Sequence, residues 1–78
     1  MQKITNVQDL GILVRNERKR QKLTQEALAA ATGVGVRYIR ELEQGKETCY
    51  IGKAIHVVQM LGIDLFAVKR GGTLREFK

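Results

Sequence analysis

The sequence is poor in the residues that cross-link small proteins. It holds one cysteine, Cys49, and one histidine, His56, among 78 residues. A single cysteine excludes an internal disulfide, and the two residues together cannot supply the four ligands of a structural zinc ion. One domain of this size buries only about 60% of the surface that its unfolded chain exposes. Association with a second subunit is therefore the stabiliser that remains.

Long apolar runs and catalytic clusters are also lacking. No apolar run approaches the roughly 18 to 20 residues of a membrane span, and residues 1–4 lack the apolar segment of a secretory signal. We therefore expect a cytoplasmic protein with no membrane partner. His56 shares the polar side of its expected helix with Lys53 and Gln59 but with no carboxylate pair, which argues against an enzyme. Nothing in the sequence requires a cofactor or a metal.

Positive charge, in contrast, is in excess. Fourteen Lys and Arg residues against eight Asp and Glu residues give a net charge of +6. This balance makes nucleic acid the leading partner class, although a soluble domain with a well-charged surface can have the same composition. The positions of the charges must decide between these two interpretations.

Apolar spacing and capping residues predict four helices, over 7–21, 25–33, 36–44 and 51–61. Thr5 or Asn6 can cap the first helix, Thr24 the second and Gly35 the third. Four basic residues of the first helix follow helical spacing: Arg15, Arg18, Lys19 and Lys22. In the fourth helix we expect the buried residues to be Ile51, Ala54, Ile55, Val58 and Leu61.

A short β-prone run occupies residues 63–68, after Gly62. A single strand leaves N–H and C=O groups unpaired, so we infer that it pairs with the same strand of a second subunit and also covers Val57 and Met60. The residues expected in this dimer strand are Ile63, Leu65, Phe66, Ala67 and Val68. The expected division is thus a DNA-binding and dimerisation domain over 1–70 and a flexible basic tail over 71–78.

Two helices joined by a tight glycine turn in a basic helical domain describe a DNA-binding helix-turn-helix. The stretch LTQEALA at 23–29, with Gly33, Val34, Ile39 and LEQG at 42–45, resembles the Xre or phage-repressor family. The continuation GVRYIRELEQGK at 35–46, with Cys49 and IGK at 51–53, is more narrowly similar to HipB-type antitoxins and their Y4mF-like relatives. The resemblance covers about residues 10–69. It implies an all-α, lambda-repressor-like bundle of four to five helices with a short C-terminal β-strand that pairs across a dimer.

The outward face of the third helix would enter the major groove. Arginines there can form paired hydrogen bonds with guanine, each pair contributing about 1–3 kcal/mol of discrimination. The resemblance places base contacts near the start of this helix and one turn later, which gives Val36, Arg37, Tyr38, Arg40 and Glu41. Two alternatives remain: Tyr38 can pack against a neighbouring helix, and Arg40 can pair with Glu41 or Glu43.

Phosphate contacts are expected around the start of the second helix, where free N–H groups and the helix dipole favour an anion. Gln25 stands there, as a glutamine does in the family. The other expected phosphate contacts are Thr24, Gly35, Gln44, Lys46, Lys22 and Lys19, with diffuse attraction as the alternative for the lysines. Family members often carry a small residue in place of Lys22. The family also pairs an arginine of the first helix with the glutamate near the end of the third, which implies a partly buried ion pair between Arg18 and Glu43.

These features together predict a homodimeric transcriptional repressor that binds its own promoter at a palindromic double-stranded operator. The resemblance implies more narrowly a type II antitoxin that neutralises a HipA-like kinase toxin. Two alternatives stay open, a protein-interaction module and a stand-alone or phage regulator of the Xre type without a toxin partner.

Overall fold

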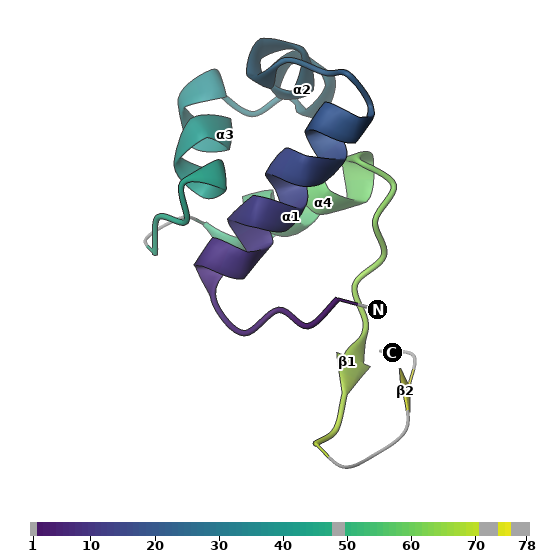
Figure 1. Ribbon diagram of the computed structural model, residues 1–78. Coiled ribbons are helices and arrows are strands. Elements are labelled where there is room, and N and C mark those ends of the chain that lie inside the picture. Colours follow the sequence, from purple (N-terminus) through teal and green to yellow (C-terminus); the bar gives the residue numbers. More distant parts are fainter. Residues whose placement is uncertain (1, 48–49, 71–73, 76–78) are drawn as a thin grey trace.

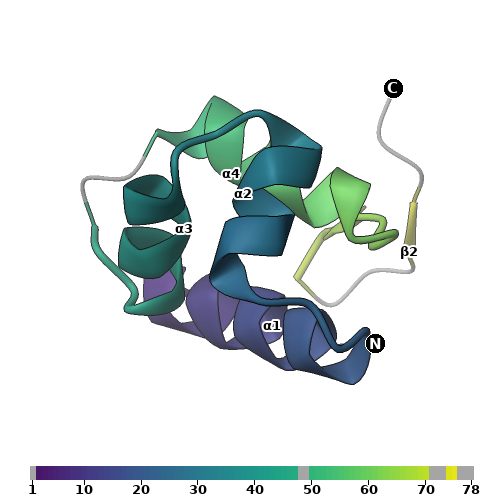
Figure 2. The same cartoon turned by 90° about the horizontal axis from the view of Figure 1, so that it is seen from above.

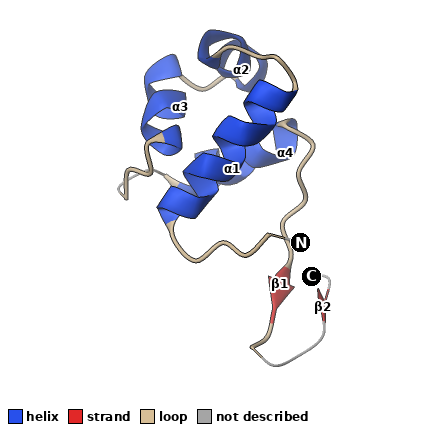
Figure 3. Cartoon of the chain, in the orientation of Figure 1, coloured by secondary structure: helices blue, strands red, loops and turns tan. Residues whose placement is uncertain are grey.

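The computed structural model describes residues 2–47, 50–70 and 74–75, so Cys49 lies outside the described part. Its helices are α1 (Val7–Arg20), α2 (Gln25–Thr32), α3 (Val36–Glu43) and α4 (Ile51–Met60), and its strands are β1 (Ala67–Val68) and β2 (Leu74–Arg75). The helices gather into one bundle, and the two strands project beyond it (Figures 1 and 3). The all-α bundle predicted from the sequence is confirmed.

Local hydrogen bonds begin and end these helices close to the predicted residues. The Asn6 side chain accepts from the Asp9 N–H at 2.8 Å, and the Thr24 hydroxyl accepts from the Ala27 N–H at 3.0 Å. Each bond satisfies an amide that has no partner inside its helix. Gly33 ends α2 with φ 77°, a left-handed conformation that glycine adopts without a steric penalty, and this permits the tight turn into α3.

The core is formed by apolar side chains from all four helices. Its buried members are Leu10, Val14, Leu28, Ala29, Ile39, Leu42, Ala54, Val57, Val58 and Leu61. His56 ties α4 to α2, because its Nε2 donates to the Thr32 carbonyl oxygen at 2.9 Å. None of the helices in the described ranges combines the length and apolar character that a bilayer crossing requires.

The prediction for α4 was wrong at three positions. Ile51 and Ile55 are 66% and 38% exposed, whereas Val57 is fully buried within its own chain. The buried side of α4 is centred on Ala54, Val57 and Val58, so the two isoleucines fall at its edge. Val57 therefore needs no cover from a second subunit.

The strand prediction also needs correction. Only Ala67 and Val68 form β1, while Ile63, Leu65 and Phe66 precede it outside any strand. The partner of β1 lies in the same chain: β2 runs antiparallel to it, with Ala67 opposite Arg75 and Val68 opposite Leu74. A returning segment a few residues away can pair at a small loop-closure cost. Residues 74–75 of the expected tail form β2, and the rest of 71–78 lies outside the described residues.

Gly11 allows α1 and α3 to approach closely. A Cβ atom at this position would overlap the carbonyl oxygen of Leu42 and lie 3.0 Å from that of Glu43. Both oxygens are backbone atoms at the end of α3, so neither can move aside without shifting the helix. No role was predicted for Gly11, although a glycine inside a helix is a signal of such a contact.

We expect Gly11→Ala to lower the free energy of unfolding by about 1–3 kcal/mol, because the added methyl group forces α3 away from α1. Gly52→Ala is the matched control, since a Cβ on this exposed residue of α4 meets nothing within 4 Å. It should raise the free energy of unfolding by about 0.5–1 kcal/mol, the usual gain of alanine over glycine in a helix. Urea unfolding of both variants tests this. Equal stabilities would contradict the close approach.

Candidate nucleic-acid interface

The helices α2 and α3 and the turn between them form the helix-turn-helix. Ile39 and Leu42 are fully buried and fix the inner side of α3 in the core. Arg37, Arg40 and Gln44 are exposed on its outer side. Figure 2 shows α3 at the edge of the bundle, beside α1 and α2. This is the arrangement that a helix needs in order to enter a DNA groove.

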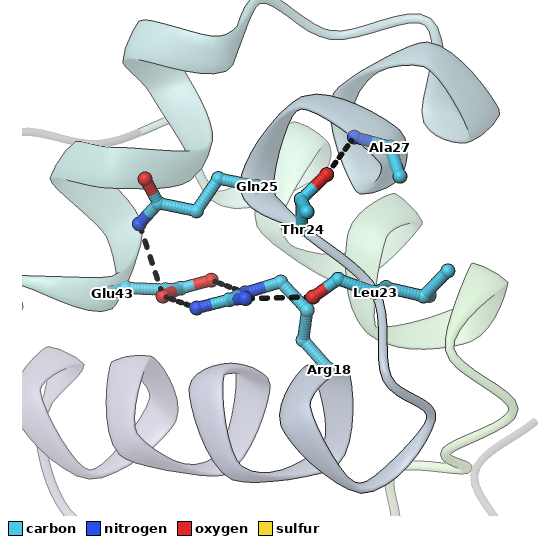
Figure 4. A network of polar contacts seen from close by, with 6 residues as sticks. All are labelled: Arg18, Leu23, Thr24, Gln25, Ala27 and Glu43. Carbon is cyan, nitrogen blue, oxygen red and sulfur yellow. Dashed lines mark hydrogen bonds and ion pairs between the residues drawn. The ribbon is translucent and has the colours of Figure 1, made fainter.

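A buried ion pair and its hydrogen bonds join α1, α2 and α3 behind this surface (Figure 4). The Arg18 guanidinium donates through Nε and Nη2 to the two carboxylate oxygens of Glu43, at 2.7 and 2.9 Å, and through Nη1 to the Leu23 carbonyl oxygen at 2.8 Å. The Gln25 amide donates to Glu43 at 3.2 Å. The resemblance pairs the same arginine and glutamate, and the structure adds Leu23 and Gln25 to them.

Burial makes this pair structural. The Arg18 and Glu43 side chains are only 10% and 4% exposed. The hydrogen bonds to Glu43 raise the pKa of Arg18, which keeps its guanidinium charged. An ion pair this well buried adds little net stability, but either member left alone is costly because its charge stays out of water.

A second, exposed network surrounds Glu41. Its carboxylate binds Lys46 Nζ at 3.2 Å and Arg37 Nε at 3.1 Å. Both contacts lower the pKa of Glu41, and the contact with Lys46 has the larger effect. The Arg37 side chain is 86% exposed, and exposed pairs of this kind are weak. Arg37 can therefore leave Glu41 for another acceptor at small cost.

Tyr38 lies at the junction of α3 and α4. Its hydroxyl donates to the Tyr50 carbonyl oxygen at 2.6 Å, and Lys53 Nζ lies 5.6 Å from the centre of its ring. Its side chain and that of Val36 also pack against the core. The geometry therefore favours the packing alternative for Tyr38 over a contact through its hydroxyl group.

The residues expected at phosphates divide into two groups, apart from Lys46, which is bound to Glu41. Thr24, Gly35 and Lys22 lie at the helix ends and turns, where Lys22 has φ 60°. That left-handed conformation costs a residue other than glycine about 1–2 kcal/mol, so glycine would be less strained at this position. Lys19, Gln25 and Gln44 instead line an open hollow of about 400 Å³ between α1 and α3.

The remaining lining residues of this hollow are Arg15, Arg18, Arg40 and Glu43. Arg15 was missed as a site residue, although its place four residues before Lys19 on the basic side of α1 was a usable signal. Arg40 forms neither of the ion pairs considered for it, because Glu43 is bound to Arg18 and Glu41 to Arg37 and Lys46.

Removing one partner of the buried pair should destabilise the fold. We expect Arg18→Ala to lower the free energy of unfolding by about 3 kcal/mol, because Glu43 keeps a buried, unpaired charge. Arg20→Ala removes an arginine of the same helix whose partner, Glu17, is reached on the surface, and it should change stability little. The double variant Arg18→Met, Glu43→Leu should recover most of the loss in urea unfolding. Failure to recover would mean that packing, and not charge, is what Arg18→Ala removes.

Comparison with known proteins places this geometry in a family. A family model described as helix-turn-helix matches residues 14–49. The HTH-type transcriptional regulator y4mF of Sinorhizobium fredii (strain NBRC 101917 / NGR234), itself uncharacterised, is 52% identical over 61 residues, which span 76% of this chain and 80% of that protein.

Solved structures agree on the fold. A HipB complex with a 20mer named O4 superposes with a TM-score of 0.76 at 22% identity, over 83% of this chain and 92% of that one. The restriction-modification controller protein C.AhdI of Aeromonas hydrophila gives a TM-score of 0.66 at 24% identity, over 74% and 88% of the two chains. The clp gene regulator ClgR of C. glutamicum gives 0.67 at 27% identity, over 80% of each chain. The chain belongs to the Xre-type helix-turn-helix family of DNA-binding transcriptional regulators.

Proposed function

We propose that the chain is a sequence-specific repressor that binds its own promoter, with α3 in the major groove of the operator. The observation that carries this proposal is the exposed outer side of α3, which presents arginines while a buried ion pair holds its inner side. The proposed base contacts are Val36, Arg37, Arg40 and Glu41, and Tyr38 contributes to this surface through its packed ring, because its hydroxyl is bound to the Tyr50 carbonyl oxygen. The proposed phosphate contacts are Lys19, Lys22, Thr24, Gln25, Gly35, Gln44 and Lys46.

Arg37 is the leading candidate for reading a base. Its guanidinium is exposed near the start of α3 and, within the part of the chain that the structure describes, is bound only to Glu41, through Nε. Its two terminal nitrogens can therefore donate to guanine O6 and N7. Glu41 can in turn accept from a cytosine N4 group, and Val36 can meet a thymine methyl group.

We expect Arg37→Ala to relax the sequence preference without unfolding the protein. Duplexes bound at physiological salt would be selected from a random-sequence pool with the wild type, with Arg37→Ala and with Arg20→Ala as a charge-matched control. The wild type and the control should enrich the same palindrome, and Arg37→Ala should lose the preference at one position of each half-site, a change of about 1–3 kcal/mol. Salt-sensitive binding without enrichment by the wild type would favour a module whose partner is another protein.

A homodimer is the second part of the proposal. Met60, Leu65, Phe66 and Val68 are between 44% and 51% exposed, so the segment that leads into β1 carries apolar side chains on its surface. Since β1 pairs with β2 on one side only, its other edge can accept a strand from a second chain. Such a dimer carries twice the charge of one chain and matches a palindrome with half-sites about one helical turn apart.

Sedimentation should therefore give twice the 8.8 kDa mass of one chain at micromolar concentration. Phe66→Asp should shift the protein toward monomers, because a charge at the interface opposes burial of its apolar side chains. Ile12→Asp is the control, since Ile12 is also 51% exposed but lies on α1. A wild-type monomer, or equal dissociation by both variants, would contradict the proposed interface.

The narrower proposal is that this repressor is a type II antitoxin that neutralises a HipA-like kinase toxin. Its support is structural likeness to HipB, including a HipA–HipB–O2–O3 complex with a TM-score of 0.76. The alternative is a regulator of the same fold without a toxin partner. The two differ in whether the dimer represses its promoter alone or together with a second protein. In both cases we propose that the chain binds its operator in the cytoplasm.

A further inference from the structure

The hollow between α1 and α3 gathers positive charge that the fold does not neutralise. Arg15 and Lys19 reach it from α1 and Arg40 reaches it from α3. Among the described residues, no carboxylate forms an ion pair with any of these three. Arg15 and Lys19 lie one helical turn apart, where like charges repel each other. The free protein thus holds three cations close together without a counter-charge.

The floor of the hollow adds no net charge but does add hydrogen-bonding groups. Arg18 and Glu43 neutralise each other there. The Gln25 side-chain amide donates one N–H to Glu43, and its second N–H can donate to a ligand. Gln44 also lines the hollow and is exposed. Gln25 is also the first residue of α2, and the first amides of a helix have no acceptor within it. Donors from three helices therefore surround one open space of about 400 Å³.

We infer that this hollow is the seat of one backbone phosphate of the operator, held by Arg15 and Lys19 from α1 and by Arg40 from α3. The inference rests on the proposed DNA-binding function and gives the two exposed arginines of α3 different roles. Arg37 reads a base, whereas Arg40 holds the backbone at the groove wall and fixes the depth of α3. Phosphate contacts set the register of a protein on DNA but carry no sequence information directly. Arg40 is thereby moved out of the base-contacting set, and Arg15 enters the site.

The test measures affinity for the selected operator and for a scrambled duplex of equal length, over a series of KCl concentrations. Arg15→Gln should weaken binding to both duplexes by the same factor, about ten-fold for each subunit, and should lower the slope of log affinity against log salt by about 0.9 for each subunit, or about 1.8 for the dimer. Arg20→Gln removes the same charge from the same helix outside the hollow and should leave the slope nearly unchanged. Because Arg15 is exposed, the variants should keep the wild-type melting temperature.

The combined variants test whether one phosphate is shared. If Arg15 and Arg40 hold the same group, the double variant Arg15→Gln, Arg40→Gln should lose less binding free energy than the two single losses added together. Arg15→Gln combined with Arg37→Gln should lose the full sum.

Two outcomes would overturn the phosphate seat alone: an unchanged salt slope for Arg15→Gln, or a changed ratio of operator to scrambled affinity for Arg40→Gln, which would mean that Arg40 reads a base. Absence of operator preference in the wild type would instead overturn the proposed function, and with it the seat.

Discussion

The position of α3 depends on how its last residues meet α1. Glu43 is the final residue of α3 and is bound by Arg18 of α1 through both of its carboxylate oxygens. The missing side chain of Gly11 lets the same end of α3 lie against α1, and the Gln8 amide donates to the Gly45 carbonyl oxygen just beyond it. Three independent contacts thus fix the C-terminal end of α3. At its N-terminal end Val36 packs against the core, and the exposed Arg37 side chain can contact a ligand.

Carboxylates are scarce in this chain, and their placement decides which cations remain available. Glu43 neutralises Arg18 in the interior, where exchange with another anion would be costly. Glu41 binds Arg37 and Lys46 at the surface, where exchange is cheap. DNA phosphates and base edges can therefore compete for Arg37 and Lys46 but not for Arg18. The fold separates a cation that builds the site from cations that act in it.

The sequence predicted the features that depend on local chemistry. The caps at Asn6 and Thr24 and the turn at Gly33 are set by neighbouring residues, so the helices begin and end within about a residue of their predicted limits. The features it missed depend on contacts between distant segments. Gly11 matters only because the end of α3 packs against it. Ile51 is exposed because packing in the bundle buries the side of α4 that carries Val57 and Val58. The pairing of β1 with β2 likewise depends on β2, which has two residues and is too short to be recognised from its own sequence.

The path of the chain links α3 to the proposed dimer. The α4 helix carries the chain from the DNA-facing side toward β1, and Val57 and Val58 anchor it in the core. At its end the Gln21 amide of α1 donates to the Leu61 carbonyl oxygen at 2.8 Å, and Gly62 then turns the chain with φ 83°. The segment that leads to β1 therefore leaves the bundle from a fixed point on α1, the helix that also holds α3. In a two-fold dimer built on β1, the distance between the two copies of α3 would be set by α1 and by the turn at Gly62, so that operator spacing follows from contacts far from any base.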